Sequence, residues 1–276
     1  VAGSPAVTRA MRISPVPAKR CLYSKRSFLV HGKYMTSKWD FTHHVVPPIS
    51  SSSTFRLETA ERGAAGFCGY CDPKERAHQR GEIFIYDRLD EPTRAMLEER
   101  LALVEDGEIA VCFSTGMAAI SAALMMMLKA GDEVLAHHAL YGCTYSLLTN
   151  WLPRYGIRVR YADFTKPDRL KFGPKTRCVL YETPVNPTLE LIDIAEVSAV
   201  CRKRGVLSIV DNTFATPFCQ RPLALGADLV AHSLTKNICG FGTDMGGAVI
   251  TRKEFESSLL LYRKDFGGVL ASKSAW

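Results

Sequence analysis

An aspartate and a lysine stand near the ends of two neighbouring apolar runs, and both side chains can take part in catalysis. Asp211 directly follows residues 206–210, and Lys236 lies shortly beyond residues 227–231. Short β-rich runs of this kind predict buried strands. Ligands of open α/β sheets bind at the carboxyl ends of the parallel strands. The sequence therefore predicts that an acid and a lysine meet one small molecule at this edge.

Pyridoxal 5'-phosphate needs two protein groups of these types. A lysine amine forms a Schiff base with the cofactor aldehyde, and an acid keeps the pyridinium nitrogen protonated. Lys236 and Asp211 match these roles, and the hydroxyls of Ser233 and Thr235 are placed to meet the phosphate. Taken alone, the same residues could be a strand-end turn and a solvated loop charge. The surrounding motifs decide between the two interpretations.

Six motifs favour a cofactor site. The stretch from about residue 46 to the last residue contains, in order, YDRLDEPT, STGMAAI, LYGCTY, YETPVNPT, VDNTFATPF and HSLTK. This series resembles the Cys/Met-metabolism (trans-sulfuration) enzymes that use pyridoxal phosphate, among them methionine γ-lyases, cystathionine synthases and lyases, and O-acylhomoserine sulfhydrylases. The resemblance implies pyridoxal 5'-phosphate as the cofactor, a homodimer that shares its sites and, for a full-length enzyme, a tetramer.

The resemblance also implies roles for particular residues. Tyr86 and Arg88 are expected to cross to a neighbouring subunit and bind its cofactor phosphate, for which an Arg fork is well suited. Tyr141 is expected to stack on the cofactor ring and to transfer protons, so that the catalytic residues are Lys236, Tyr141 and Asp211. The further cofactor contacts that the resemblance implies are Glu182, Asn186 and Thr213.

A phosphate site is also indicated by residues 114–117, which read Ser-Thr-Gly-Met and turn directly into an apolar helix. A helix amino terminus after a turn of small residues is an anion site. The backbone N–H groups of Gly116 and Met117 are therefore expected to hold the cofactor phosphate.

Two features point to one subgroup of the family. Cys143 resembles the cysteine that methionine γ-lyases carry at this place, and Lys264 with Asp265 resembles a second mark of that subgroup, so all three are expected on the substrate side. The resemblance then implies α,γ-elimination of methionine to 2-oxobutanoate, ammonia and methanethiol. Asn237 after the lysine departs from the pattern. Alternatives are γ-replacement by an O-acylhomoserine sulfhydrylase or cystathionine γ-synthase, a cystathionine lyase, and a cofactor-binding fragment without turnover.

The elements that must position these residues alternate along the chain. Strands separated by helical runs indicate βαβ units and a mostly parallel sheet. Together with the resemblance, this gives an α/β fold of pyridoxal-phosphate fold type I, with a seven-stranded sheet between two helix layers (three-layer αβα). The expected strands are residues 109–113, 133–136, 157–161, 178–181, 206–210 and 227–231, with a last one ending near residue 250. The expected helices begin at Pro92, Ala118, Tyr141 and Ile194.

Composition excludes other classes. The net charge of +7 comes from eight basic residues before Asp40, because the rest of the chain has 27 basic and 28 acidic residues. This distribution argues against a nucleic-acid-binding face. No apolar run approaches the ~20 residues that span a bilayer. Nine scattered cysteines suit a reducing compartment, and hence the cytoplasm. Neither the pair Cys68 and Cys71 nor His43 and His44 has a full ligand set, so no metal is expected.

The expected domain plan has four parts. Residues 1–42 are a basic leader, 43–81 an extended arm and loop, 82–262 the cofactor-binding large domain, and 263–276 the start of a link to a carboxy-terminal domain that the chain lacks. Residues 255–262 are expected to form a helix that leads outward, so that Leu259, Leu260 and Leu261 are left uncovered. A chain of this kind would bind the cofactor weakly, aggregate and lack the substrate's carboxylate clamp.

Overall fold

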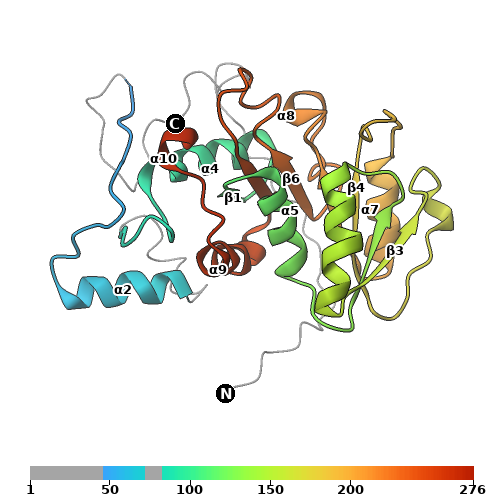
Figure 1. Ribbon diagram of the computed structural model, residues 1–276, viewed down its shortest axis with the longest axis horizontal. Coiled ribbons are helices and arrows are strands. Elements are labelled where there is room, and N and C mark those ends of the chain that lie inside the picture. The colour runs from blue at the N-terminus through green and yellow to red at the C-terminus, as the bar shows by residue number, and fades with distance from the viewer. Residues whose placement is uncertain (1–45, 72–82) are drawn as a thin grey trace.

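A seven-stranded sheet forms the centre of the computed structural model, which describes residues 46–71 and 83–276 (Figure 1). The strand order is β1-β7-β6-β5-β4-β2-β3. Strand β7 is antiparallel to both of its neighbours, and the other pairs are parallel. The mostly parallel sheet is therefore confirmed. The strands are β1 (Ile109–Phe113), β2 (Glu133–His137), β3 (Arg158–Ala162), β4 (Thr176–Glu182), β5 (Leu207–Asp211), β6 (Leu229–Ser233) and β7 (Gly247–Thr251).

Helices cover both faces of the sheet and complete the three layers. One face packs against α5, α9 and the segment from α6 to η2, and the other packs against α4, α7 and α10. The α-helices are α2 (Ala60–Cys71), α4 (Pro92–Val104), α5 (Gly116–Met125), α6 (Gly142–Ser146), α7 (Ile194–Lys203), α8 (Thr216–Cys219), α9 (Glu256–Phe266) and α10 (Ser272–Ala275). The other helical segments are the π-helix η1 (Leu147–Trp151) and the 3-10 helices η2 (Leu152–Tyr155), η3 (Pro167–Arg169) and η4 (Lys253–Phe255).

Alternation along the strands assigns each side chain to one of the two cores. Leu180 and Ile209 belong to the apolar cluster under α5, whereas Tyr181 and Val210 belong to the cluster under α7. Glu182 and Asp211, which follow Tyr181 and Val210 in the chain, therefore project from the α5 face. The sheet in this way directs the last residues of β4 and β5 to the face where α5 begins.

Helix α2 was not expected, because three glycines between residues 60 and 71 suggested a loop. The hydroxyl of Thr59 accepts the N–H of Arg62 at 3.1 Å and caps the first turn. A Cβ at Gly66 would lie 2.7 Å from Ile85 and 2.8 Å from Ile83. The glycine therefore allows the helix to lie against this segment, and the predicted loop is wrong for residues 60–71.

Helix α9 buries two of the three leucines that were expected to be uncovered and half-buries Leu261, so that prediction is also wrong. Leu259 and Leu260 are buried in the cluster under α5. Arg263 is buried one turn later, where its guanidinium pairs with Glu98 of α4 and donates to the carbonyl of Leu89 at 2.6 Å. The helix is thus held against the sheet by apolar packing and a buried ion pair.

The predicted leader and the first residues of the arm lie outside the described residues, as do His43 and His44. In the part of the chain that the structure describes, no helix has the length and apolar character needed to cross a membrane.

Candidate active site

Asp211, Thr213 and Ser233 form a hydrogen-bonded chain across the ends of β5 and β6. Thr213 donates its N–H at 3.0 Å and its hydroxyl at 2.5 Å to Oδ1 of Asp211. The N–H of Ser233 donates to the same threonine hydroxyl at 2.8 Å. Three residues expected at the cofactor therefore lie together, and the carboxylate of Asp211 is fixed by two donors from Thr213.

The amino terminus of α5 meets these strand ends. A Cβ at Gly116 would lie 2.7 Å from the Cβ of Ser233, so only glycine allows this approach. The hydroxyl of Thr115 caps the helix by accepting the N–H of Ala118 at 3.1 Å. Among the described residues, the N–H groups of Gly116 and Met117 have no partner and lie at the start of the helix. Free donors next to a serine hydroxyl fit a phosphate group.

Lys236 lies just beyond β6, at the same edge of the sheet. Its N–H donates to the carbonyl of Ser233 at 3.3 Å, and its side chain is exposed. The hydroxyl of Thr235 accepts the N–H of Gly246 at 3.1 Å and donates to the carbonyl of the same residue at 3.3 Å. Thr235 thus fixes the turn that carries the lysine, while its contact with a phosphate stays a prediction.

Glu182, at the end of β4, ties together the segments that carry Asn186 and Tyr141. Its Oε1 accepts the N–H of Asn186 at 2.8 Å, and its carboxylate also interacts with the backbone of Tyr141. Burial, and to a smaller extent the charge of Asp211, raises the pKa of Glu182 to about 7. Burial also raises the pKa of Asp211, against the lowering effect of its bonds from Thr213. The two acids therefore lie close enough to influence each other.

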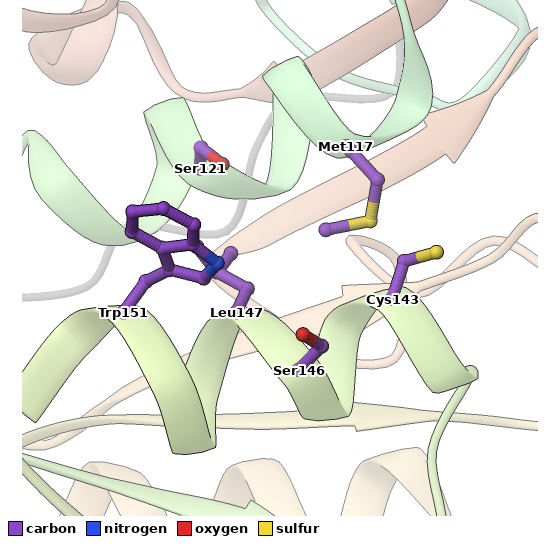
Figure 2. A pocket seen from close by; sticks show the side chains of 6 residues that line it. All are labelled: Met117, Ser121, Cys143, Ser146, Leu147 and Trp151. Carbon is purple, nitrogen blue, oxygen red and sulfur yellow. The ribbon is translucent and has the colours of Figure 1, made fainter.

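A hollow of about 380 Å³ opens between α5 and the helical segment that contains Cys143. Figure 2 shows Met117 and Ser121 on one side and Cys143, Ser146, Leu147 and Trp151 on the other. The thiol of Cys143 donates to Oη of Tyr141 at 3.5 Å. A tyrosine hydroxyl next to a small-molecule cavity can serve as a proton donor.

Arg88 lies between Tyr86 and the backbone of Lys264. In residues 46–71 and 83–276, the guanidinium of Arg88 contacts the carbonyl of Lys264 and the ring of Tyr86, 5.3 Å from the ring centroid. Lys264 pairs with Asp265 at 3.2 Å. The structure thus joins these four residues to one another, and their roles in a neighbouring or substrate site stay predictions.

A buried polar network lies behind the strand ends, and no sequence pattern predicted it. The carboxylate of Glu105, directly after α4, pairs with Nε2 of His232 and accepts the side-chain N–H of Asn212 at 2.8 Å. All three side chains are buried. Asn212 and His232 are each adjacent in sequence to a predicted site residue, whereas Glu105 contacts them only in the folded protein.

One group of three side chains could in principle hold a metal within the described residues: His137, His138 and Asp163, whose ligand atoms lie within 4.8 Å of one another. Nδ1 of His137 already accepts the N–H of Phe164 at 3.1 Å, and Asp163 pairs with Lys166 at 2.7 Å. These contacts occupy groups that a metal would need, so the structure offers no argument for a metal there.

The parallel sheet, its acid and lysine at one edge, and the anion-binding helix start define the class of pyridoxal-phosphate enzymes of fold type I. The family described as Cys/Met metabolism PLP-dependent enzyme matches residues 27–276, and the chain belongs to this family. The predicted family and its cofactor, pyridoxal 5'-phosphate, are thereby confirmed. The match begins earlier than residue 46, where the recognised motifs were expected to start.

Relatives with different activities resemble the chain to a similar degree. An L-methionine gamma-lyase of Pseudomonas deceptionensis is 40% identical over 232 residues, which are 83% of this chain and 56% of that protein. A probable cystathionine gamma-synthase of Herpetosiphon aurantiacus is 38% identical over 238 residues, 85% of this chain and 69% of that protein. The crystal structure of cystathionine gamma-lyase from Lactobacillus plantarum complexed with L-serine has a TM-score of 0.79 at 28% identity, covering 92% of this chain and 62% of that one.

Proposed function

We propose that the protein acts in pyridoxal-phosphate-dependent α,γ-elimination on methionine. With water, this reaction gives 2-oxobutanoate, ammonia and methanethiol. The observation that carries the proposal is Cys143, which donates to the hydroxyl of Tyr141 at the edge of the hollow. The similarity to L-methionine gamma-lyase supports the same reaction. Because the chain spans a little over half of that relative, the activity is a proposal for the protein as a whole.

The residues divide the work by their positions. The N–H groups of Gly116 and Met117, with the hydroxyl of Ser233, would hold the phosphate. When bound, pyridoxal phosphate draws electrons away from the α-carbon of an amino acid. Asp211 would keep the ring nitrogen protonated, and Nζ of Lys236 would anchor the cofactor and then accept the α-proton. Tyr141 would donate a proton to the leaving sulfur.

A second candidate is γ-replacement or cystathionine cleavage. The similarity to a probable cystathionine gamma-synthase is close to that of the methionine γ-lyase, and Asn237 departs from the expected motif. Elimination and replacement need the same acid, lysine and tyrosine. The residues that bind the departing and arriving groups decide between the two outcomes, and Cys143 favours elimination.

The protein is further proposed to work as a homo-oligomer in the cytoplasm. Tyr86 and Arg88 are exposed and would reach the phosphate of a neighbouring subunit. The seven cysteines that the structure describes are free thiols, three of them buried. Free thiols suit a reducing compartment.

The test is a parallel assay of the protein, supplied with pyridoxal phosphate, on L-methionine, O-acetylhomoserine and cystathionine. We expect methanethiol and 2-oxobutanoate from methionine as the fastest reaction. Lys236→Ala should lose the visible absorption of the lysine-bound cofactor and all turnover, whereas Lys129→Ala, at an exposed lysine elsewhere, should keep both. Faster turnover of either other substrate would favour the second candidate. Bound cofactor without turnover would indicate a cofactor-binding protein.

A further inference from the structure

Two carboxylates stand side by side at the edge of the sheet. Glu182 and Asp211 are direct partners in the register of β4 and β5. The residues two positions earlier, Leu180 and Ile209, both belong to the cluster under α5, so the two acids project from the same face. Glu182 is only 5% exposed. Two such groups on adjacent strands do not ionise together without a penalty, and one of them tends to hold a proton.

The surroundings of the two acids are unequal. Oδ1 of Asp211 accepts two hydrogen bonds from Thr213, and these bonds lower the pKa of Asp211 against the raising effect of its burial. Within residues 46–71 and 83–276, Glu182 accepts only backbone N–H groups, and no cation there contributes to its pKa. Helix α5, which covers this face, has no ionisable side chain.

We infer that Glu182 is a positioning residue that carries the proton of this pair in the cofactor-free protein, so that Asp211 stays ionised, and that it releases the proton when a cationic pyridine ring binds at Asp211. The inference rests on the proposed cofactor site. It explains why β4 ends in a buried acid beside the acid that the cofactor needs. The raised pKa of Glu182, about 7, agrees with the geometry.

The sign of the linkage follows from the charges. A cation at Asp211 favours the ionised form of Glu182, so its pKa falls on binding and a proton is released near neutral pH. Affinity for the cofactor therefore rises with pH through about 7, in proportion to the protons released. Glutamine is isosteric with the neutral acid and cannot release a proton. Glu182→Gln should therefore bind like the parent protein at low pH and fall behind as the pH rises.

The experiment measures the dissociation constant of pyridoxal 5'-phosphate by fluorescence titration between pH 5.5 and 8.5, without any substrate. The proteins are the parent, Glu182→Gln and the control Glu190→Gln, which removes an exposed carboxylate from the same segment. We expect the ratio of dissociation constants, Glu182→Gln over parent, to rise from about one to about tenfold, since one pKa unit corresponds to a factor of about ten. The control ratio should stay near one throughout.

A second readout counts protons directly. Calorimetric titration at pH 7 in two buffers of different ionisation enthalpy should show a larger proton release for the parent than for Glu182→Gln. If Glu182 served only to hold Asn186 and Tyr141, the loss of affinity would be the same at every pH, and the inference would be overturned. Equal proton release from the two proteins would also overturn it. Absence of binding by all three proteins would instead refute the cofactor site itself.

Discussion

Burial sets the protonation of individual residues, and His137 is the clearest case. Its side chain is fully buried at the end of β2, and burial lowers its pKa from 6.5 to about 4. Nδ1 accepts the N–H of Phe164, which a neutral imidazole can do and an imidazolium cannot. The folded protein therefore keeps this histidine neutral over a range in which the unfolded chain would protonate it.

Stability should consequently depend on pH through His137. Between about pH 6.5 and 4 the unfolded chain binds the extra proton, so the free energy of unfolding falls as the pH falls. From pH 7 to pH 5 the expected loss is about 1–2 kcal/mol. His137→Asn keeps an acceptor for Phe164 but cannot titrate, so its urea-derived stability should change less with pH. His138→Asn, at the exposed neighbour, is the control; an unchanged slope in His137→Asn would contradict the prediction.

At the scale of elements, the site depends on how closely three backbones approach. Strand β7 begins at Gly247, where an added Cβ would lie 2.1 Å from the carbonyl oxygen of Thr115 and 2.7 Å from the N–H nitrogen of Gly116. The start of α5 can therefore rest against β7 only because this residue has no side chain. The position of the anion-binding donors follows from that contact.

Gly247→Ala should displace the start of α5. We expect a loss of about 1–3 kcal/mol in stability, as for other overpacked sites, together with weakened binding of pyridoxal phosphate. Gly142→Ala is a matched control next to Tyr141, because an added Cβ there would meet nothing within 4 Å. Thermal unfolding and cofactor titration of both variants check this. Normal cofactor affinity in Gly247→Ala would show that this contact does not position the phosphate donors.

At the scale of the whole molecule, the predicted site residues form two hydrogen-bonded groups in the part of the chain that the structure describes. Arg88 contacts Tyr86 and the carbonyl of Lys264, whereas Asp211 and Ser233 are joined through Thr213. We propose that a second copy completes the site, so that one subunit supplies the lysine and the other supplies the arginine.

Mixing two inactive variants of an active form of the protein tests whether two subunits share each site. Lys236→Ala and Arg88→Ala should each be inactive, but mixed dimers contain one site with both native residues. We therefore expect turnover to return on mixing, up to about a quarter of the parent level for random pairing with one intact site in each hybrid. Mixing Lys236→Ala with Asp211→Asn is the control, because both residues belong to the same side of the site. Verified mixed dimers without activity would show that each subunit builds its site alone.

The sequence by itself determined the family, the cofactor and nearly all strands. The expected run 109–113 matches β1, and the other expected strands differ from the observed ones by a few residues at their ends. Short apolar runs between glycines and polar residues are a local signal of buried strands. Asp211 and Lys236 were placed at one sheet edge for the same reason. Where local composition misled, as in the glycine-containing helix α2, a distant contact at Gly66 decided the structure.

Only the tertiary structure decided which distant groups meet. Glu105 and His232 are 127 positions apart along the chain, and nothing in either local pattern predicts their buried pair. The neighbouring acids Glu182 and Asp211 depend on the register of β4 and β5, and the burial of Leu259 and Leu260 depends on how α9 packs. Sequence periodicity indicates which face of a helix or strand is apolar. The element that packs against this face depends on the fold of the whole chain. The packing of distant elements therefore decides which groups of the site hold a proton.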